Sequence, residues 1–184
     1  MDNKMRQEVA QRILKNGGVG VMPTDTIYGL VGSAFSKKAV ARIYALRKRD
    51  PKKPMIILIS SLSDLRKFAV KLAPEIKKIL KKFWPGKVSI ILPCASKKFS
   101  YLHRGTKTLA FRFPRKKALR TLLKKTGPLV ATSANVEGKK PASTIREARK
   151  YFGSNVDFYL DVGTLAGEPS SLIKVEQGRI AKLR

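Results

Sequence analysis

The chain has 184 residues, of which 40 are Lys or Arg and 12 are Asp or Glu, so its formal net charge is +28. A hydrophobic content of 43% is typical of a globular protein and excludes a disordered chain. The single cysteine, Cys94, and the single histidine, His103, exclude an internal disulfide and a Cys/His zinc cluster. The longest apolar run, residues 55–59, is too short to span a membrane, and the N-terminus lacks the apolar core of a secretory signal. We therefore expect a soluble, cytoplasmic protein.

The positive charge is concentrated in the middle of the chain. Residues 37–127 contain 27 Lys or Arg and three acids, whereas the rest contains 13 basic and 9 acidic residues. Such a region has a strong positive potential, which favours nucleic acid, nucleotide phosphates or an anionic membrane as partners. Lysines on the solvated faces of helices would give the same excess, so charge alone does not identify the ligand.

Apolar periodicity, caps and turn residues predict helices and strands in alternation. Helices are expected over residues 5–15, from the cap Ser36 to about residue 47, after Ser61 or Ser63, from Pro74 toward residue 83, and over 115–125 and 144–151. Strands are expected over residues 19–22, 27–31, 54–59, 88–92, 109–113, 129–132, 158–160, 171–175 and 179–183. No repeat or linker divides the chain, so a single domain is expected over 1–184. The imperfect alternation favours an α/β fold with a mixed twisted sheet flanked by helices.

Familiar phosphate-binding and hydrolytic motifs are absent from the sequence. It contains no G-x-x-x-x-G-K-[ST], no strand-borne G-x-G-x-x-G, no H-E-x-x-H and no G-x-S-x-G. Because His103 is the one imidazole, a hydrolase triad is not expected.

The first predicted strand leads into a loop rich in hydroxyl groups, residues 23–29 (Pro-Thr-Asp-Thr-Ile-Tyr-Gly). Ligands of α/β proteins commonly bind just after a strand, and this loop supplies hydroxyls and one carboxylate there. A turn whose Thr and Asp side chains satisfy their own backbone would have the same composition. Both interpretations stay open on this segment alone.

The most basic segment, residues 47–54 (Arg-Lys-Arg-Asp-Pro-Lys-Lys-Pro), follows a predicted helix and precedes a predicted buried strand. Its two prolines favour a rigid elbow over a mobile charge run. Arginine can hold a phosphate through two parallel hydrogen bonds, whereas lysine supplies a point charge. This elbow is therefore a candidate phosphate site.

Two later segments are also candidates for ligand binding. Residues 129–135 (Leu-Val-Ala-Thr-Ser-Ala-Asn) form a strand that ends in small polar residues, which let a ligand approach the backbone and offer directional hydrogen bonds. Residues 163–171 form a glycine-spaced loop before a strand, which could close over a site.

In this order, the segments resemble the YrdC-like family, the threonylcarbamoyl-AMP synthases. The family patterns are a P-T-[DE]-T-x-[YF]-G loop, a K-x-R-P…K-P elbow, a W-P-G-x-x-T strand, an A-V-R strand, an S-A-N-x-S-G segment and a late P-S-T. They match residues 23–29, 47–54, 84–89, 110–112, 133–138 and 169–171. The resemblance covers essentially the whole chain, which looks like the short form without an extra C-terminal domain.

The sequence departs from these patterns at a few positions. Arg47 stands where the family has the elbow lysine, which keeps the charge but changes its reach and geometry. The other departures are Ser89 for Thr, Phe111 for a small aliphatic residue, Glu137 for Ser and Ser171 for Thr. The chain stops at Arg184, where the family usually has Arg-Pro-Gly, so Arg184 would be the last functional position.

The resemblance implies a YrdC-like open fold with a concave basic cleft and the conversion of L-threonine, bicarbonate and ATP into L-threonylcarbamoyladenylate and pyrophosphate. It implies ATP binding by Arg47, Arg49, Lys53, Ser133, Asn135 and Arg184, with Arg47 and Arg49 also catalytic, and threonine binding by Thr26, Arg112 and Ser170. Mg²⁺ is expected to arrive on the ATP phosphates, with no metal ligand from protein side chains. The product would feed a downstream tRNA threonylcarbamoyl transferase for the t6A modification of tRNA.

Two other interpretations compete with this one. A non-catalytic RNA-binding protein, for tRNA or an rRNA precursor, would use the basic face, although aromatic residues for base stacking are only scattered through it. A carbamoyl-transfer module of a hydrogenase-maturation protein is disfavoured, because the chain lacks the accompanying acylphosphatase and zinc-finger segments.

Overall fold

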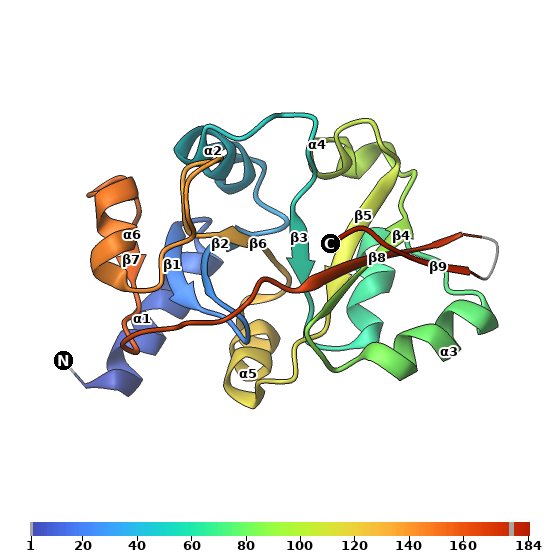
Figure 1. The fold of residues 1–184 in the computed structure, drawn as a ribbon, viewed down its shortest axis with the longest axis horizontal. Coiled ribbons are helices and arrows are strands. Elements are labelled where there is room, and N and C mark those ends of the chain that lie inside the picture. The colour runs from blue at the N-terminus through green and yellow to red at the C-terminus, as the bar shows by residue number, and fades with distance from the viewer. Residues whose placement is uncertain (1, 177–178) are drawn as a thin grey trace.

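The computed structural model describes residues 2–176 and 179–184. Within these residues the strands form one nine-stranded mixed sheet in the order β7-β1-β2-β6-β3-β5-β4-β8-β9 (Figure 1). Parallel pairs are β1 with β7, β3 with β5 and β4 with β8, and the other neighbours are antiparallel. The strands are β1 Val19–Pro23, β2 Tyr28–Ser33, β3 Ile56–Leu58, β4 Val88–Pro93, β5 Thr108–Arg112, β6 Leu129–Ser133, β7 Phe158–Tyr159, β8 Ser171–Glu176 and β9 Arg179–Lys182.

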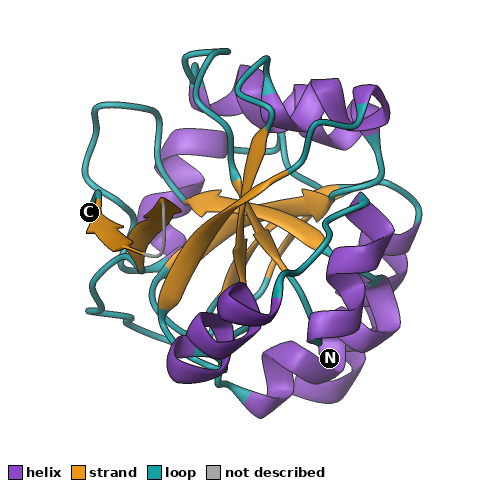
Figure 2. Ribbon diagram, turned by 90° about the vertical axis from the view of Figure 1, so that its right-hand side faces the viewer, coloured by secondary structure: helices purple, strands orange, loops and turns teal. Residues whose placement is uncertain are grey.

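The helices surround this sheet, with the strands in the centre of the molecule (Figure 2). The α-helices are α1 Asn3–Lys15, α2 Lys37–Arg47, α3 Pro74–Phe83, α4 Ser100–His103, α5 Lys117–Thr126 and α6 Ile145–Phe152, and two 3₁₀ helices span Leu62–Phe68 and Lys97–Phe99. None of the helices in the described residues is both long enough and apolar enough to cross a bilayer.

The two faces of the sheet are covered by separate hydrophobic clusters. Successive residues of a strand point to opposite faces, so Leu30 joins the cluster that includes the α2 residue Ile43, whereas Val31 joins the cluster of α1 and α5. Leu14 of α1 and Leu123 of α5 are both buried in that second cluster. This two-sided burial accounts for strands that are almost continuously apolar.

The predicted mixed α/β fold is confirmed, and the capping signals behave as expected. Ser36 accepts a hydrogen bond from the Ala39 amide at the start of α2, and Thr144 accepts one from the Glu147 amide at the start of α6.

Three local expectations need correction. The strand expected over 54–59 is only Ile56–Leu58, and just before it the carbonyls of Lys53 and Pro54 accept hydrogen bonds from the Arg49 guanidinium. The stretch after Ser61 is a 3₁₀ helix without a side-chain cap. The helix expected from residue 115 begins at Lys117.

Candidate active site

A cavity of about 260 Å³ lies over the central strands. Its floor consists of residues that the sheet brings into register: Gly29 of β2 pairs with Ser133 of β6, and Ile56 of β3 pairs with both Ala131 of β6 and Ala110 of β5. Four neighbouring strands therefore present mainly small side chains on one face of the sheet, which leaves room above them for a ligand. The walls come from loops and from the C-terminus.

One wall is the turn between β1 and β2, which Thr24 organises. Its hydroxyl donates to the Ile27 carbonyl at 2.7 Å and accepts from the amides of Thr26 and Ile27 at 3.2 and 3.3 Å. Both Thr24 and Thr26 line the cavity. The two interpretations of this segment are thus compatible, since Thr24 satisfies the backbone while Thr26 faces the cavity.

The Arg112 guanidinium lies against this turn. Its Nη1 is 3.4 Å from the Thr26 hydroxyl, and its Nη2 is 3.0 Å from Asp25 Oδ1, with the side chains of both Arg112 and Asp25 only 5% exposed. Burial lowers the pKa of Arg112, the Asp25 carboxylate opposes that shift, and the charge of Arg184 adds to it. Arg112 is therefore a buried cation with one carboxylate partner.

Arg47 is held inside the protein at the end of α2. It donates from Nε to the Asn135 carbonyl and from Nη2 to Asn135 Oδ1, both at 2.8 Å, and it also donates to the hydroxyls of Thr132 and Ser133. Burial, and then the nearby charge of Arg49, lower the pKa of Arg47 to about 10, with Glu137 opposing the shift. Arg47 fastens α2 to the end of β6 while still lining the cavity.

Two more guanidinium groups close the cavity. Arg49 donates to the carbonyls of Lys53 and Pro54 at 3.0 and 2.9 Å, which fixes it across the elbow. Arg184 donates through Nε and Nη2 to the Ser170 carbonyl at 3.2 and 3.1 Å, and burial together with the charge of Arg49 lowers the pKa of Arg184. Guanidinium groups gathered this closely form a site that an anion would stabilise.

The structure brings most of the predicted site residues together around this one cavity: Thr26, Arg47, Arg49, Arg112, Ser133, Ser170 and Arg184. The Ser170 hydroxyl lies 3.0 Å from that of Ser89, one of the positions that depart from the family patterns. The chosen residues thus come from a turn, a helix end, two strands, a loop and the C-terminus.

Two predicted residues lie outside the cavity lining. Lys53 is exposed, and its ammonium lies 3.2 Å from Glu137 Oε1 and 3.9 Å from Asp50 Oδ2. Asn135 is buried, with its amide bonded to Arg47 and to the Lys139 carbonyl. Asn135 therefore supports Arg47 in this structure, and the ATP-binding roles of both residues stay predictions.

Sequence reasoning did not single out Thr132 or Thr24, which also line the cavity. Thr132 could have been inferred, because it directly precedes the chosen Ser133 at the end of a strand. The sequence shows Asp25 as the carboxylate of this loop, but it holds no signal of the pairing with Arg112, 87 positions away in the chain.

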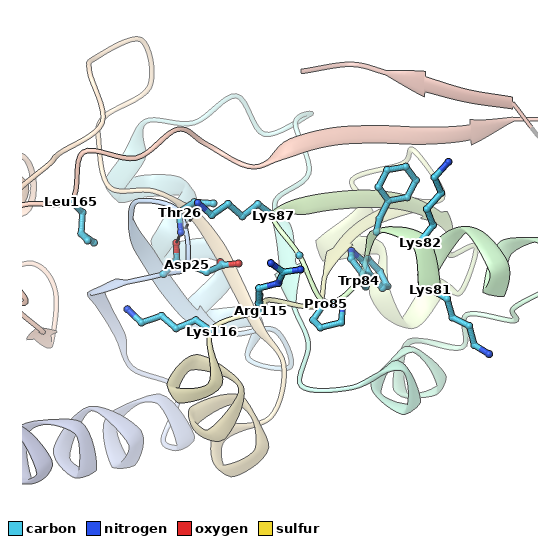
Figure 3. A pocket seen from close by; sticks show the side chains of 13 residues that line it. Asp25, Thr26, Lys81, Lys82, Trp84, Pro85, Lys87, Arg115, Lys116 and Leu165 are labelled. Carbon is cyan, nitrogen blue, oxygen red and sulfur yellow. Dashed lines mark hydrogen bonds between the residues drawn. The ribbon is translucent and has the colours of Figure 1, made fainter.

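A second cavity, of about 730 Å³, shares Thr24 and Thr26 with the first (Figure 3). Asp25 and Thr26 form one side of it and Trp84 and Pro85 the other, and its five cations, all exposed, are Lys81, Lys82, Lys87, Arg115 and Lys116. Apart from Lys82, which lies 6.0 Å from the Phe83 ring, none of these cations has an ion pair, hydrogen bond or ring contact with another residue of the described chain.

Comparison with known proteins finds a matching family model and relatives that are named as threonylcarbamoyl-AMP synthases. The family model Sua5_yciO_yrdC, described as "Telomere recombination", matches residues 12–184. A putative threonylcarbamoyl-AMP synthase of Methanocaldococcus jannaschii is 32% identical over 185 residues, which cover 100% of this chain and 86% of the relative. A threonylcarbamoyl-AMP synthase of Methylobacillus flagellatus is 32% identical over 180 residues, covering 97% of this chain and 99% of the relative.

Solved structures share the fold. P. abyssi Sua5 complexed with L-threonine superposes with a TM-score of 0.89 at 27% identity, and the match covers 100% of this chain. This chain spans about half of that one, 54%. E. coli YciO superposes with a TM-score of 0.85 at 24% identity, a likeness of fold alone. With the family model covering nearly its whole length, the chain belongs to the Sua5/YciO/YrdC family.

Proposed function

We propose that the protein is a threonylcarbamoyl-AMP synthase, which forms L-threonylcarbamoyladenylate and pyrophosphate from L-threonine, bicarbonate and ATP. The observation that carries this proposal is the convergence of Arg49, Arg112 and Arg184 on one small cavity that also holds the Thr26 and Ser170 side chains. The names of the relatives agree with it, and L-threonine is bound in the P. abyssi structure.

Threonine would occupy the end of the cavity formed by Thr26, Arg112 and Ser170. A buried guanidinium is suited to the α-carboxylate, because arginine matches a carboxylate with two parallel hydrogen bonds and the low dielectric strengthens the attraction. The two hydroxyl groups provide short polar partners that a small hydroxylated amino acid can reach.

ATP would place its phosphates against Arg49 and Arg184, whose charges have no carboxylate partner among the described residues. Ser133 and the adjacent small residues of β6 would allow the nucleotide to approach the strand closely. Arg47 holds the end of β6 in place, so its contribution combines charge with positioning.

The chemistry requires little covalent work from the protein. The threonine amine takes up bicarbonate with loss of water to give a carbamate, and a carbamate oxygen then attacks the α-phosphorus of ATP. An O–P bond forms, the bond from the α-phosphorus to the bridging oxygen breaks, and pyrophosphate leaves. Positioning the two substrates in line and neutralising the phosphate charge would supply most of the rate enhancement.

Mg²⁺ would enter as part of the MgATP substrate. Among the described residues no group of three or more His, Cys, Asp and Glu side chains could cage a metal ion, and Asp25, beside the cavity, is paired with Arg112. The phosphates and water would therefore hold the ion.

We also propose that the adenylate passes to a tRNA threonylcarbamoyl transferase in the cytoplasm. The alternative of a non-catalytic RNA-binding protein is not favoured, because the relatives are named as synthases.

The test is pyrophosphate release from ATP, with mass-spectrometric detection of the adenylate, while threonine and bicarbonate are omitted in turn. We expect release only when both are present. Release that ignores threonine, or RNA binding with no release at all, would overturn the proposal.

A further inference from the structure

Asp25 occupies an unusual place between the two cavities. Its side chain is 5% exposed, and it lines the larger cavity, whereas Arg112 lines the smaller one. The carboxylate thus approaches Arg112 from outside the substrate cavity. It can hold the guanidinium without standing next to a bound carboxylate, which it would otherwise repel.

The contacts of the pair leave part of each group unused. Asp25 Oδ1 lies 3.0 Å from Arg112 Nη2, yet neither carboxylate oxygen has a hydrogen-bond partner of good geometry among the described residues. Arg112 Nε is likewise buried without a partner, while Nη1 lies 3.4 Å from Thr26. One side of the guanidinium is therefore restrained by Asp25, while Nε is buried without a partner.

The charges around the pair explain why this restraint is needed. The charge of Arg184 lies close enough to depress the pKa of Arg112, so repulsion favours a displaced Arg112 side chain. A buried ion pair costs desolvation, so its net contribution to stability is small and its effect here is to fix geometry. Asp25 is the one acid among the described residues lining either cavity.

From this geometry we infer that Asp25 is a positioning residue, which orients the Arg112 guanidinium toward the carboxylate of L-threonine. The inference rests on the proposed function, because it takes threonine as the occupant of the smaller cavity. The inference requires that the side chain at position 25 present an oxygen atom to Arg112. Asparagine, which keeps that oxygen, should replace Asp25 far better than alanine does.

The experiment measures the Kd of L-threonine and of ATP by calorimetry, and their KM values by pyrophosphate release, for the wild type, Asp25→Ala and Asp25→Asn. Asp64→Ala is the matched control, since Asp64 is also a buried carboxylate with a cationic partner, Lys67 at 2.7 Å, but lines neither cavity.

We expect Asp25→Ala to weaken threonine binding about 10-fold or more, with ATP binding changed less than about twofold, because the buried Arg112 guanidinium then loses its carboxylate partner. Asp25→Asn should stay within about threefold of the wild type, and Asp64→Ala should leave both ligands unaffected. If Asp25→Ala fails to fold, Asp25→Ser, whose side chain is too short to reach Arg112, takes its place.

Unchanged threonine binding in the alanine or serine variant would overturn the inference, as would equal weakening of threonine and ATP. Weakening of threonine by asparagine as strong as by alanine would also overturn it, because charge and not position would then be responsible. Threonine binding without pyrophosphate release would refute the proposed function and leave the binding test valid. A wild-type protein that binds no threonine would refute both.

Discussion

The two cavities that share Thr24 and Thr26 are both rich in cations, but they are organised differently. In the smaller one, Arg47, Arg49 and Arg184 are fixed by hydrogen bonds to carbonyls and hydroxyls, and Arg112 is fixed by a carboxylate. In the larger one, the cations are exposed at the ends of long side chains (Figure 3).

The difference shows that the organisation of the cations matters more than their number. A guanidinium that is already held loses little conformational entropy when a ligand binds, whereas an exposed lysine loses much. Salt screens an exposed charge but has less effect on a buried one. Substrate binding should therefore depend on the smaller cavity, although the larger one carries more of the cationic side chains.

The largest expected effect is the loss of a phosphate-binding guanidinium. Arg49→Ala should lower kcat/KM for adenylate formation by about 10²- to 10³-fold, which corresponds to about 2.7–4 kcal/mol of transition-state stabilisation. Arg115→Ala removes the same group from the larger cavity and should stay within about twofold of the wild type. Threonine-dependent pyrophosphate release measures kcat/KM in both variants. Similar losses of kcat/KM in the two would contradict the different roles given to the two cavities.

A second comparison concerns stability. Arg47→Met leaves the acceptors of Thr132, Ser133 and Asn135 without their donor, so the free energy of unfolding should fall by about 2–4 kcal/mol. Lys116→Met, in the larger cavity, should leave it unchanged within error. Urea denaturation with a constant m-value measures both. An Arg47→Met protein as stable as the wild type would show that these hydrogen bonds are not part of the folded state in solution.

A smaller effect is expected at the turn that the two cavities share. Thr26→Val keeps the shape but removes a hydroxyl that lies 3.0 Å from that of Thr24 and 3.4 Å from Arg112. The KM for threonine should rise about 10-fold, while the KM for ATP stays unchanged. Steady-state kinetics with each substrate varied in turn provides the measurement. Equal rises in both KM values would show that Thr26 does not belong to the amino-acid pocket.

The smallest effect is expected from neutralising exposed lysines. The double variant Lys81→Gln, Lys116→Gln should retain wild-type kcat/KM and be slightly more stable at low salt, because the formal charge of +28 falls and self-repulsion decreases. The gain should disappear at high salt. Denaturation at two salt concentrations tests this, and a clear loss of activity would assign a substrate role to the larger cavity.

The sequence predicts local features well because their causes are local. Ser36 and Thr144 cap the helices that follow them, and Pro74 opens α3, since each acts on a neighbouring turn of the chain. The order of the strands has distant causes. The insertion of β6 between β2 and β3 depends on pairings between segments far apart in the chain, which no local pattern encodes.

The functional site was also predictable only in part. Short motifs identified the segments that form the site. They did not show which side chains are already hydrogen-bonded or ion-paired within the folded protein. Glu137 lies 84 positions from Lys53 and accepts a hydrogen bond from it, so a lysine that looks free in the sequence is already paired. Arginine is usually a surface residue. Arg47 is nevertheless only 4% exposed, because α2 ends against β6.

The most direct test of the account is a crystal structure with L-threonine and a non-hydrolysable ATP analogue. The account predicts threonine against Thr26, Arg112 and Ser170, with the triphosphate against Arg49 and Arg184. A triphosphate bound among Lys87, Arg115 and Lys116 in the larger cavity would contradict it.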